Sequence, residues 1–291
     1  MPYTLKSSEW FAGGFPIAVE RREPQKSFPP HKHEFSEIVI ITGGKCLHIV
    51  GRESWPLSAG DVFVIGGPQA HAYRDLENLQ LINILFQPEK LRLQLGDLTR
   101  LPGYHALFAL EPVWRRRHQF KSRLHLSPQN LGVVLALADQ LETELKQRSP
   151  GFGFLAMALF MQILGYLSRC YGNSRNADSR QLLRIASAIA HLESNTHEVA
   201  NLNHLAGIAR MSKRSFVRAF SDATGQPPIA YLIQLRVNRA AALLRSSTES
   251  ITEVAFRVGF SDSNYFTRQF RKVTGVSPRR YRQQQASVKA N

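Results

Sequence analysis

Three histidines and one glutamate in the first quarter of the chain have the types and spacing to bind a polar molecule or a metal ion. His31, His33 and Glu37 form an H-x-H-x3-E pattern, and His71 closes a later GDVFVIGGPQAH block. Imidazole nitrogens and carboxylate oxygens can ligate a divalent metal, and they can equally hydrogen-bond a small ligand. Because side chains alternate along a strand, His31 and His33 would share one face.

Both interpretations of these four residues remain open. We favour a sensor pocket, in which the four groups hydrogen-bond an effector or one another, and we therefore assign no metal and no other cofactor. A metal, if one is bound, would use the same four ligands. His48 lies within an apolar run, which predicts a buried histidine.

A second constellation, near the C-terminus, has residue types that read DNA. Asn264 and Arg268 are one helical turn apart, and in the major groove Asn pairs with adenine and Arg with guanine. Phe266 and Phe270 are also one turn apart and would face inward. The alternative interpretation is a surface helix with ordinary polar residues.

Helix-end signals would position this constellation. Ser250 and Glu253 fit a capping box that starts a helix at Ile251, and Gly259 can take the left-handed conformation that ends it. Ser261 could then cap the next helix. Together these signals predict a helix-turn-helix.

The same pattern occurs twice. Leu202, Leu205, Ala206, Ala209 and Met211 stand 49 positions before Ile251, Val254, Ala255, Val258 and Phe260. Beyond the turn the offset becomes 50, so one residue is inserted near the start of the second recognition helix. Arg210 stands where the second copy has Gly259, and a left-handed Arg costs about 1–2 kcal/mol. We therefore expect a differently shaped first turn. Two copies predict contact with successive major-groove segments, roughly 34 Å apart.

Residues 236–282, RVNRAAALLRSSTESITEVAFRVGFSDSNYFTRQFRKVTGVSPRRYR, resemble the C-terminal signature of the AraC/XylS family of bacterial transcription regulators. The resemblance implies sequence-specific binding to double-stranded promoter DNA and favours activation, with RNA polymerase as a partner. We assign the DNA contacts to Lys213, Arg214, Arg218, Ser263, Asn264, Thr267 and Arg268.

Residues 17–87 consist of short β-branched runs such as IVIITGG, CLHIVG, DVFVIGG and LQLINILF, separated by polar turns. They predict an antiparallel β-barrel or sandwich. The two histidine-containing blocks resemble the cupin motifs, although Gly66 and Asp75 replace the usual Pro and Asn. The segment Phe35–Leu91 is similar to the sensor domain of the L-rhamnose regulators of the same family. The effector implied is a small sugar, with L-rhamnose the leading candidate.

Helices are predicted between these two parts of the chain. The run Arg115–Arg117 is interpreted as a solvated face, and Ser127-Pro128 starts a helix whose apolar residues form an a/d seam. Packing on the barrel and pairing in a homodimer explain that seam equally well. The stretch Phe152–Leu167, apolar almost all round, predicts a buried helix, and its length and Gln162 argue against a membrane span.

The predicted fold class is α+β multidomain. A cupin-like β-barrel with dimerisation helices occupies residues 1–171, a polar linker 172–177, and an all-α domain with two helix-turn-helix units 178–291. In that last part, Asp178 is expected to cap the first helix, and a helix over 228–245 with Ala242 on its buried face should connect the two units.

Charge and cysteine content are consistent with this organisation. Residues 181–291 hold 16 Lys/Arg against 6 Asp/Glu, net +10, whereas residues 1–180 hold 21 against 16, net +5. The polyanion-binding part is therefore C-terminal. Two cysteines make no disulfide framework, and the first residues do not form a signal peptide, which favours the cytoplasm and no membrane partner. The alternative function is a metal-dependent cupin enzyme with a DNA-binding tail. We expect no enzyme, because no separate acid/base pair is found.

Overall fold

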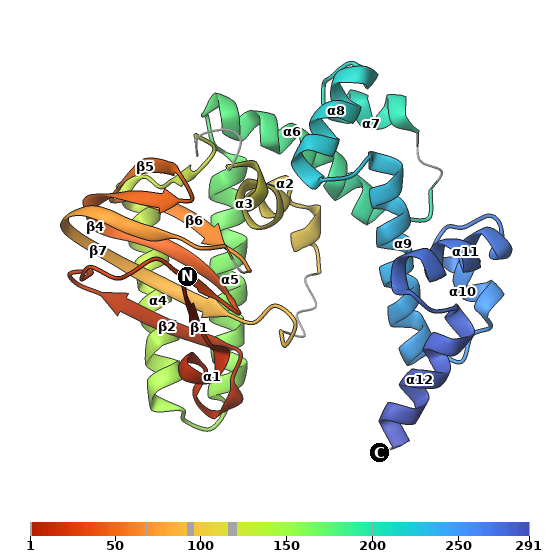
Figure 1. Ribbon diagram of the computed structural model, residues 1–291, viewed down its shortest axis with the longest axis horizontal. Helices are drawn as coiled ribbons and strands as arrows, with labels where there is room; N and C mark the ends of the chain where they lie inside the picture. Colours follow the sequence, from red (N-terminus) through yellow and green to blue (C-terminus); the bar gives the residue numbers. More distant parts are fainter. Residues whose placement is uncertain (1, 68, 92–95, 116–120, 199–200, 291) are drawn as a thin grey trace. The chain divides into compact units, whose positions relative to one another are not determined.

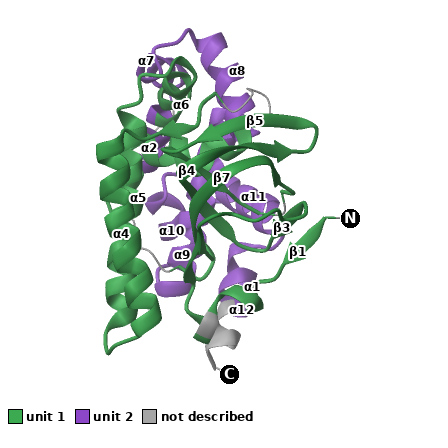
Figure 2. Ribbon diagram, turned by 90° about the vertical axis from the view of Figure 1, so that its left-hand side faces the viewer, with its two compact units in different colours: residues 1–186 green, residues 187–291 purple. Residues whose placement is uncertain are grey.

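The computed structural model describes residues 2–67, 69–91, 96–115, 121–198 and 201–290. It divides into two units, residues 1–186 and 187–291, coloured separately in Figure 2. The first unit is built on a β-sheet and the second is entirely helical, which confirms the predicted fold class (Figure 1). The division falls inside α6 (Ala177–Ser194), whereas α5 (Phe152–Gly172) ends where the linker is expected. The boundary at 172–177 stays a prediction.

The main sheet is antiparallel and is dominated by two long strands. Its order is β2-β7-β4-β6-β8, with β5 paired to β4, and a separate parallel pair joins β1 to β3. The strands are β1 (Tyr3–Leu5), β2 (Ile17–Arg22), β3 (His31–His33), β4 (Ser36–Val50), β5 (Glu53–Ser58), β6 (Asp61–Ile65), β7 (Ala72–Phe86) and β8 (Leu124–His125).

Strand β4 unites two runs that the sequence separates. IVIITGG and CLHIVG were expected to be distinct strands, yet both lie within β4, whose pairing with β7 shifts register between Ile41 and Leu47. Gly44 sits in this irregular stretch with φ 67°, and a Cβ there would lie 2.2 Å from the Asn78 carbonyl oxygen. A glycine therefore permits the close approach that bends the strand pair without ending it.

Both faces of the central strands are buried. Ile38 and Ile40 point to one face and Val39 and Ile41 to the other, and all four have no exposed surface. Burial on both faces explains why the sequence of β4 reads as a continuous apolar run rather than an alternating one. Each such side chain contributes roughly 1.5–3 kcal/mol to stability.

Two long helices pack beside the sheet. Helix α4 (Pro128–Gln147) starts at Ser127, whose hydroxyl accepts from Asn130 N, and its buried residues Val134, Ala138 and Leu141 face α5 and β2. The central part of the predicted seam is thus used within the chain. Helix α5 departs from the expectation of full burial, because Phe154 is 80% exposed.

Among the described helices, α5 is the one long and apolar enough, by length and composition alone, to cross a membrane, with a third of its most apolar window buried. The shorter helices of this unit are α1 (Ser7–Trp10), η1 (Ala12–Gly14), η2 (Leu98–Arg100), α2 (Pro102–Tyr104), η3 (His105–Leu110) and α3 (Glu111–Trp114).

The interpretation of Arg115 as a solvated residue is wrong. Its side chain is 2% exposed, and the guanidinium donates to the Glu111 carboxylate and to the Val64 carbonyl oxygen. Burial raises the pKa of Glu111, while Arg115 opposes that rise. The buried ion pair lies within α3 and its C-cap, and the hydrogen bond from Arg115 to the Val64 carbonyl oxygen ties α3 to β6; nothing in a local charge run could have revealed these partners. The rest of the run, residues 116 and 117, lies outside the described residues.

The C-terminal unit contains the end of α6 followed by six helices. They are α7 (Leu202–Ile208), α8 (Lys213–Thr224), α9 (Pro228–Ser246), α10 (Ile251–Arg257), α11 (Ser263–Thr274) and α12 (Pro278–Ala290). The connector α9 has the predicted extent, but Ala242 is exposed and Val237, Ala240 and Leu244 are buried instead. The cap of α6 is also different: Asn176 Oδ1 accepts from Asp178 N and Ser179 N, so Asp178 lies in the first turn.

Candidate DNA-binding surface and effector pocket

The two turns that connect α7 to α8 and α10 to α11 share one backbone geometry. Met211 N donates to Ala206 O at 2.9 Å, and Phe260 N donates to Ala255 O at 3.0 Å, 49 positions later. The residue before each donor is left-handed, with φ 51° at Arg210 and 98° at Gly259. The expectation of a differently shaped first turn is therefore wrong, and Arg210 adopts the strained conformation that the turn requires.

Side-chain caps start each of these helices. At α10 the capping box is confirmed, because Glu253 N donates to Ser250 Oγ at 3.1 Å and Ser250 N donates to Glu253 Oε2 at 2.7 Å. At α11 the cap is Asp262, not Ser261. Its counterpart at α8 is Ser212, 50 positions earlier, so Ser261 is the extra residue and it precedes the cap.

The inner faces of α8 and α11 each pack into the core of their own helix-turn-helix. Phe216 and Phe220 on α8, and Phe266 and Phe270 on α11, are fully buried, as predicted for the second pair. In each pair the ring centroids are 5.5 Å apart and meet edge to face. Aromatic anchors of this kind fix the rotation of a helix about its own axis, so the opposite face is held outward.

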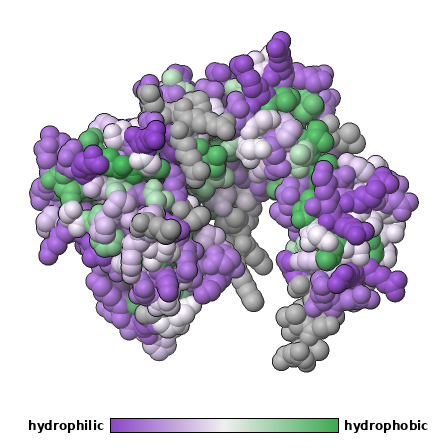
Figure 3. All heavy atoms as spheres, in the orientation of Figure 1, coloured by the Kyte–Doolittle hydropathy of each residue, from purple (hydrophilic) through white to green (hydrophobic). Residues whose placement is uncertain are grey.

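The outer faces carry the residues assigned to DNA contact. Lys213, Arg214 and Arg218 on α8 are exposed, as are Asn264 and Arg268 on α11. Hydrophilic side chains dominate the visible surface around α10 to α12 in Figure 3. Arg214 occupies the position of Asn264, and Arg218 that of Arg268, so the two helices present matched but different polar pairs. Their contact with bases stays a prediction.

Three side chains on α11 differ in how far they are free to contact DNA. Thr267 is half-buried, and its hydroxyl donates to Ser263 O at 2.9 Å within the helix, which leaves its methyl group for outward contact. Tyr265, which the sequence-based assignment missed, is 39% exposed, and the Arg268 guanidinium lies 5.9 Å from its ring centroid. This cation–π contact holds Arg268 against a neighbour on the same face.

Arg236 of the connector α9 binds the segment that follows α6 and contacts the second helix-turn-helix. Arg236 Nε donates to Thr196 O at 2.7 Å, and Arg236 Nη2 donates to Glu198 O at 2.6 Å. Its guanidinium also lies 5.7 Å from the Phe260 ring centroid. The segment that follows α6 is thereby fixed against the turn of the second unit. Sequence periodicity did not single out Arg236, because its partners are backbone carbonyls distant in the chain.

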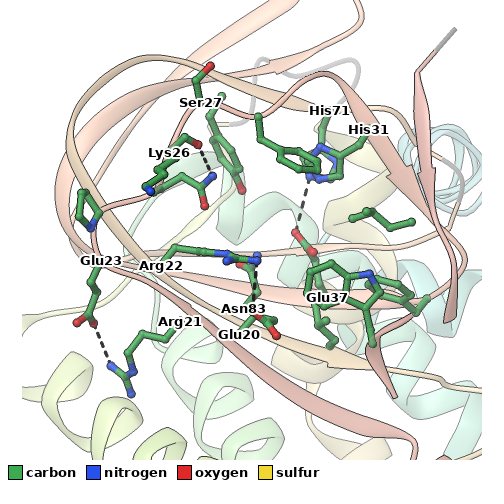
Figure 4. Close-up of a pocket in the computed structure, with 18 residues that line it drawn as sticks. Glu20, Arg21, Arg22, Glu23, Lys26, Ser27, His31, Glu37, His71 and Asn83 are labelled. Carbon is green, nitrogen blue, oxygen red and sulfur yellow. Dashed lines mark hydrogen bonds and ion pairs between the residues drawn. The ribbon is translucent and has the colours of Figure 1, made fainter. Parts of the chain in front are cut away.

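The sheet unit contains a pocket of about 380 Å³ that the residues after β2 help to enclose (Figure 4). Figure 4 shows the His31, His71 and Glu37 side chains on one side, facing Arg22 and Asn83. Its lining residues include Trp10, Glu20, Arg22, Phe28, His31, Phe35, Glu37, His71, Tyr73 and Asn83. Three of the four residues assigned to the effector thus line this pocket. His33 does not.

The fourth residue lies behind Glu37. His33 Nε2 is 3.6 Å from Glu37 Oε2, and His71 Nε2 is 3.8 Å from Glu37 Oε1. His31 is placed differently: its backbone pairs with that of His71, and its Nδ1 is 3.1 Å from the Pro29 carbonyl oxygen. His33, Glu37 and His71, two imidazoles and one carboxylate, are the described residues whose donor atoms lie close enough together to hold a metal ion.

Burial controls the charge state of this cluster. Burial raises the pKa of Glu37 to about 8 and lowers the pKa of His33 to about 4. The pKa of His71 is lowered for the same reason, with contributions from neighbouring histidines. Without a bound cation the groups are therefore neutral near pH 7.

Several polar atoms in the pocket make no hydrogen bond to another described residue. They include Trp10 Nε1, Tyr73 Oη and Asn83 Oδ1, in addition to Glu37 Oε1. Tyr73 and Asn83 both come from β7, and no sequence pattern identified them because their segment has the composition of an ordinary strand. Buried polar atoms without partners destabilise a protein unless a ligand or water satisfies them.

His48 confirms the expectation of a buried histidine. It has no exposed surface and lies among the rings of Trp55, Phe63, His71 and Tyr73, with centroid distances between 5.0 and 6.2 Å. It forms part of the wall between the pocket residues and the apolar core.

Comparison with known proteins extends over most of the chain. A family model described as an AraC-like ligand binding domain matches residues 16–164, and one described as a helix-turn-helix domain matches residues 205–284. The HTH-type transcriptional activator RhaR of Mannheimia succiniciproducens is 33% identical over 267 residues, 92% of this chain and 91% of that protein. The HTH-type transcriptional activator RhaS of Escherichia fergusonii is 34% identical over 272 residues, 92% of each chain.

Solved structures give shorter matches. A transcriptional regulator from Chromobacterium violaceum with an AraC-type DNA-binding domain is 30% identical and covers 35% of this chain and 92% of its own, with a TM-score of 0.34. The DNA-binding domain of AdpA, solved with a target DNA, is 35% identical and covers 37% of this chain and 97% of its own, with a TM-score of 0.36.

Proposed function

Because this chain belongs to the AraC family of transcription regulators, we propose that it activates transcription in response to a sugar that binds in the pocket of its sheet unit. The chain is a regulator with a helix-turn-helix DNA-binding domain and an AraC-like ligand binding domain. Relatives named as activators support activation over repression. Because these relatives are named as transcriptional activators, the metal-dependent cupin enzyme is not favoured.

The DNA-binding part of the proposal rests on one observation. Two helices with the same backbone turn and the same buried aromatic anchors both present exposed polar pairs, Arg214 with Arg218 and Asn264 with Arg268. Residues of these types can each form bidentate hydrogen bonds to a base edge. Lys213, Ser263 and the Thr267 methyl group would contact the backbone or bases beside them. The two helices would enter successive major-groove segments of promoter DNA.

The pocket supports a sugar as the effector. Its polar groups, a carboxyl, an amide, a phenol and imidazoles, match the donors and acceptors of hydroxyl groups, and its aromatic residues match the apolar face of a pyranose ring. His31, Glu37 and His71 would take part directly, whereas His33 would act through Glu37. A monosaccharide is proposed, with L-rhamnose the leading candidate on the resemblance of Phe35–Leu91 to rhamnose sensors.

The proposal also includes two protein partners and a cellular location. RNA polymerase is the partner that activation requires. A homodimer is supported by exposed apolar residues on α5, where Phe154 is 80% and Leu155 47% exposed. The cytoplasm is the location, because relatives over most of the chain are transcriptional activators, which act on chromosomal DNA.

A thermal-shift and calorimetric screen with a panel of monosaccharides tests the effector. L-rhamnose at a concentration 100 times its Kd should stabilise the sheet unit by roughly 2.7 kcal/mol, and its enantiomer should do so far less. Tyr73→Phe removes one pocket hydroxyl and should weaken the response. Tyr166→Phe is the matched control, because Tyr166 donates to Asn130 outside the pocket. If another sugar gives the binding heat, that sugar would replace L-rhamnose as the proposed effector. If Tyr73→Phe and Tyr166→Phe respond equally to the effector, the pocket assignment would be contradicted.

A further inference from the structure

The sheet unit has a second pocket, which we call the basic pocket. Its volume is about 500 Å³, and none of the described residues that line it also lines the effector pocket. The walls come from β8 and the residue before it, the first turn of α4, the last turn of α5 and the segment 173–176 that leads into α6. That segment belongs to the predicted linker, so its polar composition has a second interpretation, as one wall of a binding site.

The lining of the basic pocket is positively charged. It includes three arginines, Arg123, Arg169 and Arg175, and no Asp or Glu is among the described residues that line it. Asp61 and Asp178 line an adjoining hollow instead. Guanidinium groups around one cavity repel one another until an anion lies between them. The lining therefore favours a negatively charged ligand.

A buried carboxylate positions one edge of the basic pocket. The Asp61 side chain is 1% exposed, and its Oδ2 accepts from Ser58 N at 2.9 Å. Its Oδ1 is 2.9 Å from His125 Nδ1 and 3.1 Å from Arg123 Nε. An ionised carboxylate only accepts, so His125 Nδ1 carries a proton, and Nε2 is the ring atom left to meet a ligand. Arg123 and His125 are thus held in place from behind by a group that water barely reaches.

Arg169 and Arg175 are placed differently, because the described part of the chain provides neither with an ion pair. Both residues are exposed, and both line the basic pocket. Elsewhere in the sheet unit, Arg21 pairs with Glu142, and Arg115 pairs with Glu111. A guanidinium presents parallel N–H groups that fit two oxygens of a phosphate. A phosphate group, with nearly two negative charges and three terminal oxygens, can engage both arginines at once.

Uncharged donors complete the lining. Tyr166 Oη donates to Asn130 Oδ1 at 2.9 Å, which orients the Asn130 amide and leaves its NH2 group to donate. Ser127 Oγ accepts from Asn130 N at 3.2 Å, so its hydroxyl hydrogen is also left to donate. Ser127 and Asn130 mark the start of α4, where the positive end of the helix dipole favours an anion. These groups suit the hydroxyls and oxygens of an organic part attached to a phosphate.

We propose that the basic pocket binds a phosphorylated small molecule of the size of a sugar phosphate. Arg169 and Arg175 would hold the phosphate group, and His125, Ser127 and Asn130 would meet the hydroxyls beside it. The volume lies within the range of small-molecule sites. This ligand is anionic and its site lies outside the effector pocket, so the inference goes beyond the proposed sugar sensor. A ligand there would also join α5 to the start of α6, the helix within which the two units divide.

Isothermal titration calorimetry of the full-length protein tests the site. The probes are glucose 6-phosphate, fructose 1-phosphate and ribose 5-phosphate, at about 0.15 M salt so that long-range attraction is screened. At least one should bind saturably and more tightly than inorganic phosphate. Arg169→Gln and Arg175→Gln should each weaken that binding at least about tenfold, because each removes charge-assisted hydrogen bonds. Arg52→Gln removes the same charge from an exposed position that lines neither pocket, and it should bind as the wild type does.

The two pockets can be separated by their variants. Tyr73→Phe alters the effector pocket and should keep the binding of the sugar phosphate, whereas Arg169→Gln should keep the response to the uncharged monosaccharides. Failure of the sugar screen therefore leaves this test standing, and the reverse also holds.

Four results would overturn the proposal. They are no saturable heat with any of the three sugar phosphates up to about 10 mM, or equal weakening in Arg52→Gln, which would reduce the effect to net charge. Inorganic phosphate that binds as tightly as the sugar phosphates would contradict the ligand class. Lower DNA affinity in Arg169→Gln, without any binding of a sugar phosphate to the wild type, would assign these arginines to the DNA backbone instead.

Discussion

Replacing Gly259 with Ala should destabilise the C-terminal unit and displace α11. Gly259 has φ 98°, and an added Cβ would lie 2.6 Å from Thr196 O and 2.7 Å from His197 Cα. The left-handed conformation costs an Ala about 1–2 kcal/mol. The clash is with backbone atoms, so relief requires movement of a segment that Arg236 holds, at a further cost of about 1–3 kcal/mol. Reduced entropy of the unfolded chain returns about 0.4–1 kcal/mol, which leaves a net loss of roughly 2–4 kcal/mol.

The turn of the first helix-turn-helix supplies the matched control. Arg210 occupies the same left-handed position at φ 51° and is exposed. Arg210→Ala keeps the backbone strain and should change stability by less than about 0.5 kcal/mol. Arg210→Gly removes strain of about 1–2 kcal/mol but adds unfolded-chain entropy worth about 0.5–1 kcal/mol, so it should be neutral to mildly stabilising.

Denaturant unfolding followed by two signals measures these effects. All three tryptophans, Trp10, Trp55 and Trp114, lie in the sheet unit, residues 1–186. Tryptophan fluorescence therefore reports the sheet unit alone, whereas far-ultraviolet circular dichroism reports both the sheet unit and the C-terminal unit. Gly259→Ala should shift the dichroism transition and leave the fluorescence transition in place. A variant whose C-terminal unit unfolds within about 1 kcal/mol of the wild type would refute the argument from the turn geometry.

Three further predictions concern DNA reading, charge and pH. Arg268→Ala should weaken specific DNA binding by about 1–3 kcal/mol and relax the preference at one base position; titrations on single-base variants would instead show a uniform loss if Arg268 touches only phosphate. The fragment 177–291 should fold, bind DNA with strong salt dependence and ignore the effector, and a binding constant insensitive to salt would contradict the charge argument. Burial raises the pKa of Glu37 to about 8 in the folded protein, from an ordinary value of 4.5, so ionisation opposes folding. The unfolding free energy of the sheet unit should fall as pH rises between these values, and Glu37→Gln should reduce that slope, as measured by denaturant unfolding across pH.

The helix-turn-helix units were predictable because their signals are local. A capping box, a glycine after the helix and aromatic residues one turn apart each act within about four residues of one another, so the chain order alone places them. Where local alternatives competed, the sequence did less well. Ser261 and Asp262 are both good caps, and the choice of Asp262 depends on where α10 ends and how α11 docks.

Tertiary partners set the limit on prediction in the sheet unit. The pattern of His31, His33 and Glu37 predicted convergence with His71. The structure brings the donor atoms of His33, Glu37 and His71 together, whereas His31 lies beside His71 with its Nδ1 near the Pro29 carbonyl oxygen. Tyr73 and Asn83 complete the pocket from β7, and Arg115 is buried because Glu111 and the Val64 carbonyl are available to it. None of these partners is close in sequence, so no periodic pattern identifies them.

The contrast between Arg210 and Gly259 shows how the two reading units come to differ. Both turns have the same hydrogen bonds, so the backbone requirement is equal. Only at Gly259 does another segment, Thr196–His197, pass close enough to exclude a Cβ, and Arg236 on α9 binds that same segment. The second unit is thus fixed by a direct contact as well as by the connector helix, whereas Arg210 lies exposed at the first turn. A duplicated sequence therefore accepts Arg in one copy and requires Gly in the other. The spacing at which the two units can meet DNA should accordingly depend on Arg236 as well as on the length of α9.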